Sequence, residues 1–205
     1  MGKWSWVGPA IAGVAGGIII GAIIFSPKKK NYPSIEGRIT PHDPEVRNKA
    51  IQIVKESGDK IISQLFDIFD YMRGLKYVSD PLPEHVALPC DTLKAGGGDC
   101  DDFAVTTASL IKAVGREARV VKVTNNEIGH AFCEVLIDNV NNMNEVLAEI
   151  KNRYGGNYTI GWESDLKGNW LLFDTLLPAP GYLISNFISS QNGSWKFINS
   201  PQYYY

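Results

Sequence analysis

A run of glycines leading directly into a cysteine flanked by carboxylates constrains this chain more than any other feature. Residues 96–104 read GGGDCDDFA, and from Cys100 onward the chain turns apolar at helical spacing. The residues that would share one helical face are Cys100, Ala104, Thr107, Ile111 and Val114. Gly115 stands where a left-handed residue commonly ends a helix. The pattern therefore predicts a helix over residues 100–114 with a thiol in its first turn.

The rest of the chain places helical patterns first and strand patterns afterwards. Asp43 and Pro44 supply an N-cap acceptor and a proline for the first helical position, and residues 61–72 carry a wide apolar stripe that indicates a buried helix. Residues 118–124 and 130–137 alternate as strands, and the short turn between them makes the pair antiparallel. We also expect a loop over 79–95, a surface helix over 141–153, and strands near 157–162 and 169–174. This order predicts an α+β fold.

The N-terminus differs from the rest of the chain because residues 6–25 run for 20 residues without a charge. A helix of that length crosses a hydrocarbon layer of roughly 30 Å. A cleaved signal peptide is the alternative, but no Ala-x-Ala-like site follows the run, so we expect an uncleaved transmembrane anchor. The chain thus divides into an anchor (1–26), a linker (27–42) and a domain (43–205).

The charges around this run predict a single-pass membrane protein whose main domain faces the cytoplasm. Lys28, Lys29 and Lys30 follow the run, whereas Lys3 is the only charged side chain before it. Two sequons, at Asn157 and Asn192, would matter only on the other side of the membrane.

Small residues in the same run raise the question of pairing. Gly13, Gly17 and Gly21 lie on one helical face and would let two anchors approach closely as a homodimer. The alternative is that glycine is simply common in membrane helices.

Composition excludes some classes of protein. The net charge of −2 gives no basic face for nucleic acid. The 3 cysteines are an odd number at unpatterned spacings, which argues against a disulfide framework, and no Cys-x-x-Cys zinc spacing occurs. At least one thiol is therefore expected to be free.

Cys100 is the first candidate for chemistry. A cysteine in the first turn of a helix lies among backbone N–H groups without intrahelical partners and at the positive end of the dipole. Both effects favour the thiolate, and the same donors can hold an oxyanion. The flanking aspartates oppose ionisation unless their charge is neutralised. The alternative is that Cys100 is a small buried helix residue.

His130 and Asp174 are the partners that such a nucleophile would need. Of the 3 histidines, His42 lies in the linker, His85 lies in a proline-rich loop, and His130 begins a strand. Cys133 falls on the opposite face of that strand and is expected to be core. Asp174 ends the strand WLLFD, where an acidic residue has no packing role. A structural histidine and a turn aspartate are the alternatives.

Four segments together resemble the transglutaminase-like superfamily, and most closely its microbial cysteine proteinases. They are, in order, GGGDCDDFA, AVGREARVV, GHAFCEV and NWLLFDT, and the likeness covers residues 77–175. The resemblance implies a papain-like fold in which a central helix bearing the nucleophile packs on an antiparallel sheet. It also implies that Cys100 is the nucleophile, His130 the base and later the acid, and Asp174 the residue that orients the imidazole.

The resemblance further suggests a calcium site, since some members bind calcium through acidic residues flanking the nucleophile. Asp99 and Asp101 match those positions. The alternative is that Asp101 and Asp102 cap the helix, and for Asp102 we expect capping or an internal hydrogen bond. No other cofactor is expected.

One departure from the family concerns the oxyanion. Transglutaminases proper place a tryptophan upstream of the cysteine, and no tryptophan lies between Trp6 and Trp162 here. A donor from residues 77–95, such as Tyr77, is an alternative that the sequence alone does not favour.

The sequence as a whole predicts a membrane-anchored thiol hydrolase. We expect a peptidase or amidase that acts on a protein or peptide substrate through an acyl-enzyme. Two alternatives stay open. One is acyl transfer to amines by the same residues, and the other is a binding or scaffold module without activity.

Overall fold

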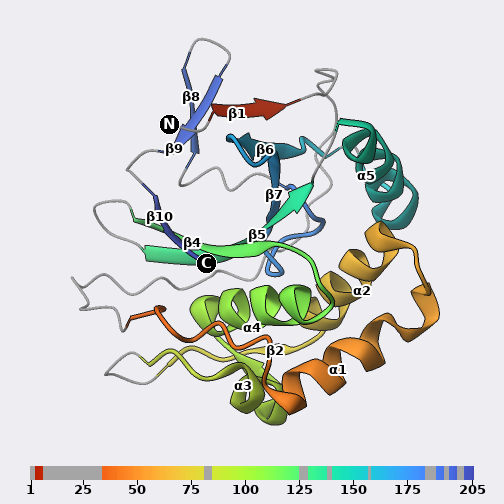
Figure 1. The fold of residues 1–205 in the computed structure, drawn as a ribbon. Helices are drawn as coiled ribbons and strands as arrows, with labels where there is room; N and C mark the ends of the chain where they lie inside the picture. Colours follow the sequence, from red (N-terminus) through yellow and green to blue (C-terminus); the bar gives the residue numbers. More distant parts are fainter. Residues whose placement is uncertain are drawn as a thin grey trace.

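The protein is described by a computed structural model over residues 3–6, 34–80, 85–124, 129–137, 140–156, 158–182, 188–191, 194–197 and 201–205. Within these ranges a layer of helices packs against a 6-stranded antiparallel sheet (Figure 1). The helices are α1 (Pro44–Val54), the short 3-10 helix η1 (Lys55–Ser57), α2 (Ile61–Arg73), α3 (Pro89–Ala95), α4 (Cys100–Ala113) and α5 (Val140–Tyr154). The predicted α+β class is confirmed.

The main sheet has the strand order β1-β6-β7-β5-β4-β10, with every neighbouring pair antiparallel. Its strands are β1 (Lys3–Trp6), β4 (Ala118–Thr124), β5 (Gly129–Ile137), β6 (Gly161–Ser164), β7 (Asn169–Phe173) and β10 (Gln202–Tyr204). Two smaller pairs are parallel β2 (Lys76–Tyr77) with β3 (Gly97–Gly98), and antiparallel β8 (Ile188–Gln191) with β9 (Ser194–Phe197). The register from Ala118↔Val135 to Thr124↔Gly129 confirms the predicted antiparallel pair.

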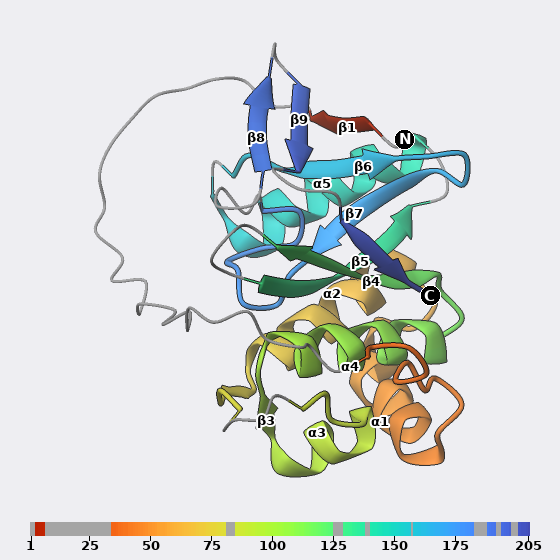
Figure 2. The same ribbon diagram turned by 90° about the vertical axis from the view of Figure 1, so that its left-hand side faces the viewer.

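Helix α4 is the centre of the domain. It contacts strands β4 and β5 on one side and helices α1 and α3 on the other, and helix α2, which itself packs on the sheet, lies beside it (Figure 2). Every residue from Asp101 to Ile111 is buried, although the helix also carries polar side chains such as Thr106 and Ser109. A helix buried on all sides holds a fixed position, so its first residue, Cys100, is set by the core.

The helix boundaries follow the signals in the sequence. Asp43 Oδ1 accepts hydrogen bonds from the backbone N–H of Glu45 at 2.9 Å and of Val46 at 3.2 Å, and Pro44 begins α1. Gly115 follows α4 with φ of 78°, the left-handed conformation that glycine adopts without strain. Both predictions are confirmed.

The prediction of a continuous loop over residues 79–95 was wrong. Residues Pro89–Ala95 form α3, which has its proline at the start and ends at the left-handed Gly96 with φ of 67°. Proline is tolerated in the first helical turn, because its missing N–H would have no intrahelical partner there. Pro89, which lies within the predicted loop, therefore marks a helix start.

The strand expected near residues 157–162 is displaced and becomes β6, Gly161–Ser164. Before it, Ile160 forms an isolated antiparallel bridge with Tyr182, and Gly161 N–H donates to Gly181 O at 2.8 Å. The chain just before β6 is therefore paired with the segment after β7, and the strand begins later in the sequence than predicted.

The predicted transmembrane anchor falls almost wholly outside the described residues. Of residues 6–25 only Trp6 is described, as the last residue of β1, so Gly13, Gly17 and Gly21 are not placed. The same holds for Asn157, Asn192 and most of the predicted turn at 125–129. No helix within the described ranges combines the length and the apolar character that crossing a bilayer requires.

The described part of the predicted linker, residues 34–42, packs against the domain. Ile35 is buried in the core, and the N–H of Thr40 donates to Ser109 Oγ on α4 at 3.0 Å. This segment thereby contributes to the position of the central helix.

A buried ion network lies around Arg119, which is 2% exposed. Its Nε donates to Glu134 Oε2 at 2.8 Å, and a second guanidinium nitrogen pairs with Glu163. The guanidinium lies 4.1 Å from the ring centroids of both Trp170 and Tyr203. Because these residues come from β4, β5, β6, β7 and β10, the network joins five strands of the sheet.

Candidate active site

The His130 and Asp174 side chains meet at one end of β5 and β7. His130 Nε2 donates a hydrogen bond to Asp174 Oδ2 at 2.7 Å, and both side chains are 4% exposed. The register Cys133↔Phe173 brings the start of β5 beside the end of β7, and Asp174 follows directly. The second carboxylate oxygen, Oδ1, accepts from Leu176 N–H at 3.0 Å, which fixes the carboxylate.

Cys100 is the half-buried first residue of α4, and its side chain lies close enough to the imidazole to influence the pKa of His130. Burial alone would lower the pKa of His130, but the charge and hydrogen bond of the Asp174 carboxylate, followed by the nearby Cys100 side chain, outweigh it. Together they raise the pKa of His130 to about 10. The structure thus brings Cys100, His130 and Asp174 together, while their catalytic roles stay predictions.

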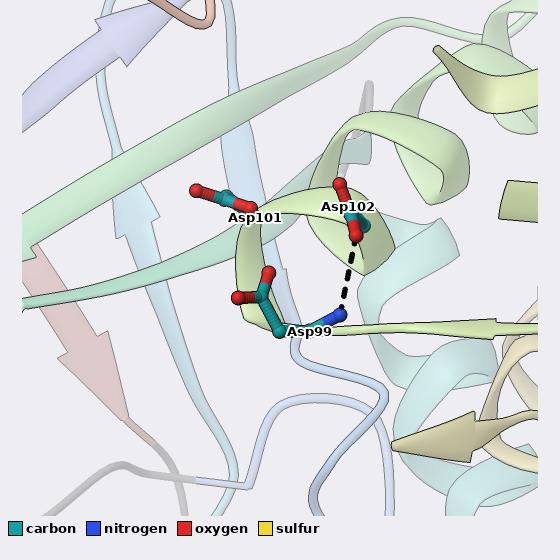
Figure 3. A group of neighbouring side chains, drawn as sticks. All are labelled: Asp99, Asp101 and Asp102. Atoms are coloured by element: carbon teal, nitrogen blue, oxygen red, sulfur yellow. Dashed lines mark hydrogen bonds between the residues drawn. The ribbon is translucent and has the colours of Figure 1, made fainter. Parts of the chain in front are cut away.

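Asp102 stabilises the start of α4, as predicted. Its Oδ1 accepts from Ala87 N–H at 2.7 Å, and its Oδ2 accepts from Asp99 N–H at 3.3 Å (Figure 3). Gly98 permits this arrangement, because a Cβ there would lie 2.7 Å from the Asp102 side chain. The glycines before the cysteine therefore let the chain pass closely over its own helix N-terminus.

Asp99 and Asp101 are placed differently from Asp102. One carboxylate oxygen from each of the three residues lies within 4.8 Å of the others. Oδ1 of Asp99 and Oδ1 of Asp101 are buried and find no hydrogen-bond partner among the described residues. Burial, a hydrogen bond with Asp99 and the nearby negative charges all raise the pKa of Asp101. Two buried carboxylate oxygens lacking donors suit a hard cation, although such ions take about 6–8 oxygen ligands.

Lys122 is a functional candidate that sequence reasoning missed. It lies on β4 and is 8% exposed, and burial lowers the pKa of its amine while the charges of Asp101 and Cys100 act in the opposite direction. Ala118 and Val120, at alternate positions of the strand, belong to the core. A lysine at a core-facing position of the strand pattern is the signal that would have drawn attention to it.

Tyr77 is the other residue that the structure brings to the site. It pairs with Gly98 across β2 and β3, and its ring meets that of Phe103 edge to face at 6.3 Å between centroids. Burial, followed by the charges of Cys100 and Asp99, raises the pKa of the Tyr77 phenol to about 12.

The other two cysteines lie apart from this cluster. Cys133 is fully buried among core residues, and burial raises the pKa of its thiol well above the ordinary range. Its prediction as a core residue is confirmed. Cys90 lies on α3 with its Sγ 3.8 Å from Asp91 Oδ1.

Comparison with known families identifies one match. Residues 47–159, more than half of the chain, match the transglutaminase-like superfamily. The matched range includes Cys100 and His130, whereas Asp174 lies beyond it. No curated protein sequence matches the chain.

Several solved structures are similar at low identity. A Cytophaga hutchinsonii protein described as a presumed cysteine protease is 16% identical, with a TM-score of 0.46 over 82% of this chain and 50% of that one. Calcium-bound LapG of Legionella pneumophila is also 16% identical, with a TM-score of 0.44 over 73% of this chain and 76% of LapG. Another LapG structure is 14% identical, with a TM-score of 0.45 over 78% and 88%. The chain spans half the length of the Cytophaga protein.

Proposed function

Because the chain belongs to the transglutaminase-like superfamily, we propose that it is a cysteine peptidase or amidase with a papain-like arrangement. One observation carries the proposal: the thiol at the start of the central helix lies close to an imidazole whose Nε2 is 2.7 Å from a buried carboxylate. A nucleophile, a base and an orienting group in this order form the arrangement that covalent acyl transfer requires.

In the first half of the reaction, the Cys100 thiolate attacks the carbonyl carbon of an amide. A carbon–sulfur bond forms, and the π electron pair of the carbonyl moves onto its oxygen. When this tetrahedral intermediate collapses, the carbon–nitrogen bond breaks. The imidazolium of His130 gives its proton to the leaving amine, and a thioester with the enzyme remains.

In the second half, water replaces the amine. Neutral His130 takes a proton from the water as its oxygen attacks the thioester carbon. Collapse of the second intermediate breaks the carbon–sulfur bond, returns the electron pair to sulfur and releases a carboxylic acid. Asp174 holds the imidazole through Nε2 in both halves and stabilises its charged form, which makes it a positioning residue.

The two acidic residues beside the thiol, Asp99 and Asp101, would support this chemistry by binding a cation. Asp99 and Asp101 would hold a calcium ion, which would offset their negative field on Cys100 and stiffen the first turn of α4. Support for this part of the proposal comes from their buried oxygens that lack hydrogen-bond donors.

The proposal includes the substrate and setting that the sequence predicts. The substrate is a protein or peptide, and residues 6–25 would anchor the domain to a membrane. Such an anchor requires β1 to leave the main sheet, because a single pass places Lys3–Trp6 on the opposite side of the bilayer from β6. Partition of the full chain into the membrane fraction, and its release when residues 1–26 are deleted, would support the anchor. Release of the full chain by a salt wash alone would contradict it.

A cysteine replacement series tests the proposed function. We expect Cys100→Ala to abolish hydrolysis of fluorogenic peptide mixtures and to remove the fast phase of labelling by an iodoacetamide dye, with an unchanged circular dichroism spectrum. Cys90→Ala is the matched control, since it removes the other half-buried thiol and should leave hydrolysis intact. Hydrolysis by purified Cys100→Ala at the wild-type rate would refute the assignment.

A further inference from the structure

The reaction proposed above creates a negative oxygen that the enzyme must stabilise. The backbone N–H of Cys100, at the start of α4, offers one donor. Sites for acyl transfer place a second donor beside the first. Together the two donors stabilise the negative charge that develops on the oxygen in the transition state. Asp99 and Asp101 flank the thiol, but carboxylates that hold a calcium ion, as proposed above, cannot donate. A second donor must therefore come from another element.

The Tyr77 phenol is placed beside the start of α4 by two independent contacts. Its backbone pairs with Gly98, two positions before the nucleophile, and Val78 N–H extends the pairing by donating to Gly98 O at 2.8 Å. Its ring packs on Phe103. Phe103 lies three positions after Cys100, so the two residues are neighbours on the surface of the helix. The ring therefore lies alongside the first turn that carries the thiol.

The state of this phenol suits a donor. Tyr77 is 41% exposed, whereas His130 and Asp174 are almost wholly buried, so its side chain is accessible to a bound substrate. The pKa of about 12, raised mainly by burial, keeps its O–H protonated near neutral pH. A neutral hydroxyl is stabilised little by the resting thiolate. Its hydrogen bond becomes charge-assisted, and therefore stronger, when the negative charge moves to the carbonyl oxygen of the substrate.

From this placement we propose that the Tyr77 hydroxyl donates a hydrogen bond to the oxyanion of the tetrahedral intermediate, together with the Cys100 N–H. The inference rests on the proposed hydrolysis and names a further catalytic residue for it. The electron pair and proton balance of the reaction are unchanged, since the phenol keeps its proton throughout.

Lys122 is the competing donor. Its amine also lies in the field of Cys100, but it is 8% exposed and interacts with the charge of Asp101 from within the sheet. The greater exposure of Tyr77 favours the phenol as the group that a bound substrate meets.

The test compares Tyr77→Phe with the wild-type full chain in three measurements. We expect kcat for peptide hydrolysis to fall about 100-fold with KM nearly unchanged, as for loss of one oxyanion donor. Affinity for a peptide aldehyde, which forms a tetrahedral adduct with the thiol, should fall in parallel. The rate of alkylation by iodoacetamide should stay within about twofold, because that reaction forms no oxyanion.

Two variants serve as controls. Tyr158→Phe removes the hydroxyl of a tyrosine that packs on Tyr182, away from the thiol, and should leave all three measurements unchanged. Tyr77→Gln, which restores an N–H donor, should recover part of kcat, whereas a merely structural role of the ring would give no recovery.

The outcomes separate this inference from the function on which it rests. Wild-type kcat and aldehyde affinity in Tyr77→Phe would overturn the role of Tyr77 alone, and an equal loss in Lys122→Met but not in Tyr77→Phe would assign the donor to Lys122. A parallel fall in alkylation rate would make Tyr77 a residue that positions the thiol. Absence of hydrolysis and of aldehyde binding in the wild type would overturn the proposed function itself.

Discussion

His130 and Asp174 form a hydrogen bond of 2.7 Å from which solvent is almost excluded on both sides. In such surroundings a charged pair is stabilised only if both members stay in place, because either one alone would be a buried charge without compensation. The pair therefore links the positions of these two side chains to the protonation of the imidazole.

Replacing the carboxylate tests that link. We expect Asp174→Asn to lower kcat by at least about 100-fold, because a neutral amide no longer favours the imidazolium or fixes its tautomer. Asn can still accept from Leu176 N–H, so the fold should persist. Steady-state kinetics with a circular dichroism check measures both. A kcat within about threefold of wild type would show that Asp174 does not orient His130.

The raised pKa of His130 predicts a pH dependence of stability. The folded protein holds a proton on His130 up to a pKa of about 10, against an ordinary value of 6.5. The resulting stabilisation is fully present below pH 6.5 and is lost as the pH rises through 10. In urea titrations at several pH values, the free energy of unfolding of wild type should therefore fall over this window more steeply than that of His130→Gln. Parallel curves for the two proteins would contradict the prediction.

The network around Arg119 predicts a contrast between two arginine replacements. Arg119→Met should lower the free energy of unfolding by about 3–5 kcal/mol, because it leaves Glu134 and Glu163 buried without their counter-charge. Arg153→Met is the matched control. Arg153 pairs with Asp67 and Asp70 at a partly exposed site, so its loss should cost about 0–1 kcal/mol. Equal costs in denaturant titration would contradict the assignment of the first network as structurally essential.

The acidic residues beside the thiol predict a response to calcium. Added calcium should raise the melting temperature of wild type, because an ion bound only by the folded state stabilises that state. Asp99→Asn and Asp101→Asn should lose this increase, whereas Glu56→Gln, on the exposed 3-10 helix, should keep it. Unchanged activity and melting temperature across a chelator titration would remove calcium from the proposal.

The final step of the reaction distinguishes hydrolysis from acyl transfer. With a glutamine-containing peptide and a fluorescent primary amine, a hydrolase should release mainly the acid even at millimolar amine. Mass spectrometry of the products measures the ratio. Predominant amine adduct that depends on Cys100 would assign the chain to the transfer reaction instead.

Local signals in the sequence predicted those parts of the fold that local physics decides. The capping residues Asp43 and Gly115 fixed helix ends, and strict alternation fixed β4 at its observed bounds, Ala118–Thr124. The helix Pro89–Ala95 was missed because a proline signals a loop and a helix start equally well.

The order in which the strands pair across the sheet was harder to predict from the sequence. The sequence identified His130 and Asp174 through their chemistry and a family resemblance, but their contact depends on β5 lying beside β7 rather than beside β6. Strand order is a property of the assembled sheet, which no single segment encodes. Lys122 stands at a core-facing position that its strand pattern could have indicated, but its neighbour Asp101 comes from α4, which packs against the sheet.

The three members of the candidate triad come from the start of α4, the start of β5 and the residue after β7. A nascent chain therefore exposes an ordinary thiol until the strand carrying Asp174 has been synthesised and has docked. Contacts between such distant segments form late in folding, because closing long loops costs entropy before any pairing is gained. Reactivity would then appear only on maturation of the whole domain, so an unfinished or truncated copy would pose little hazard to the proteins around it.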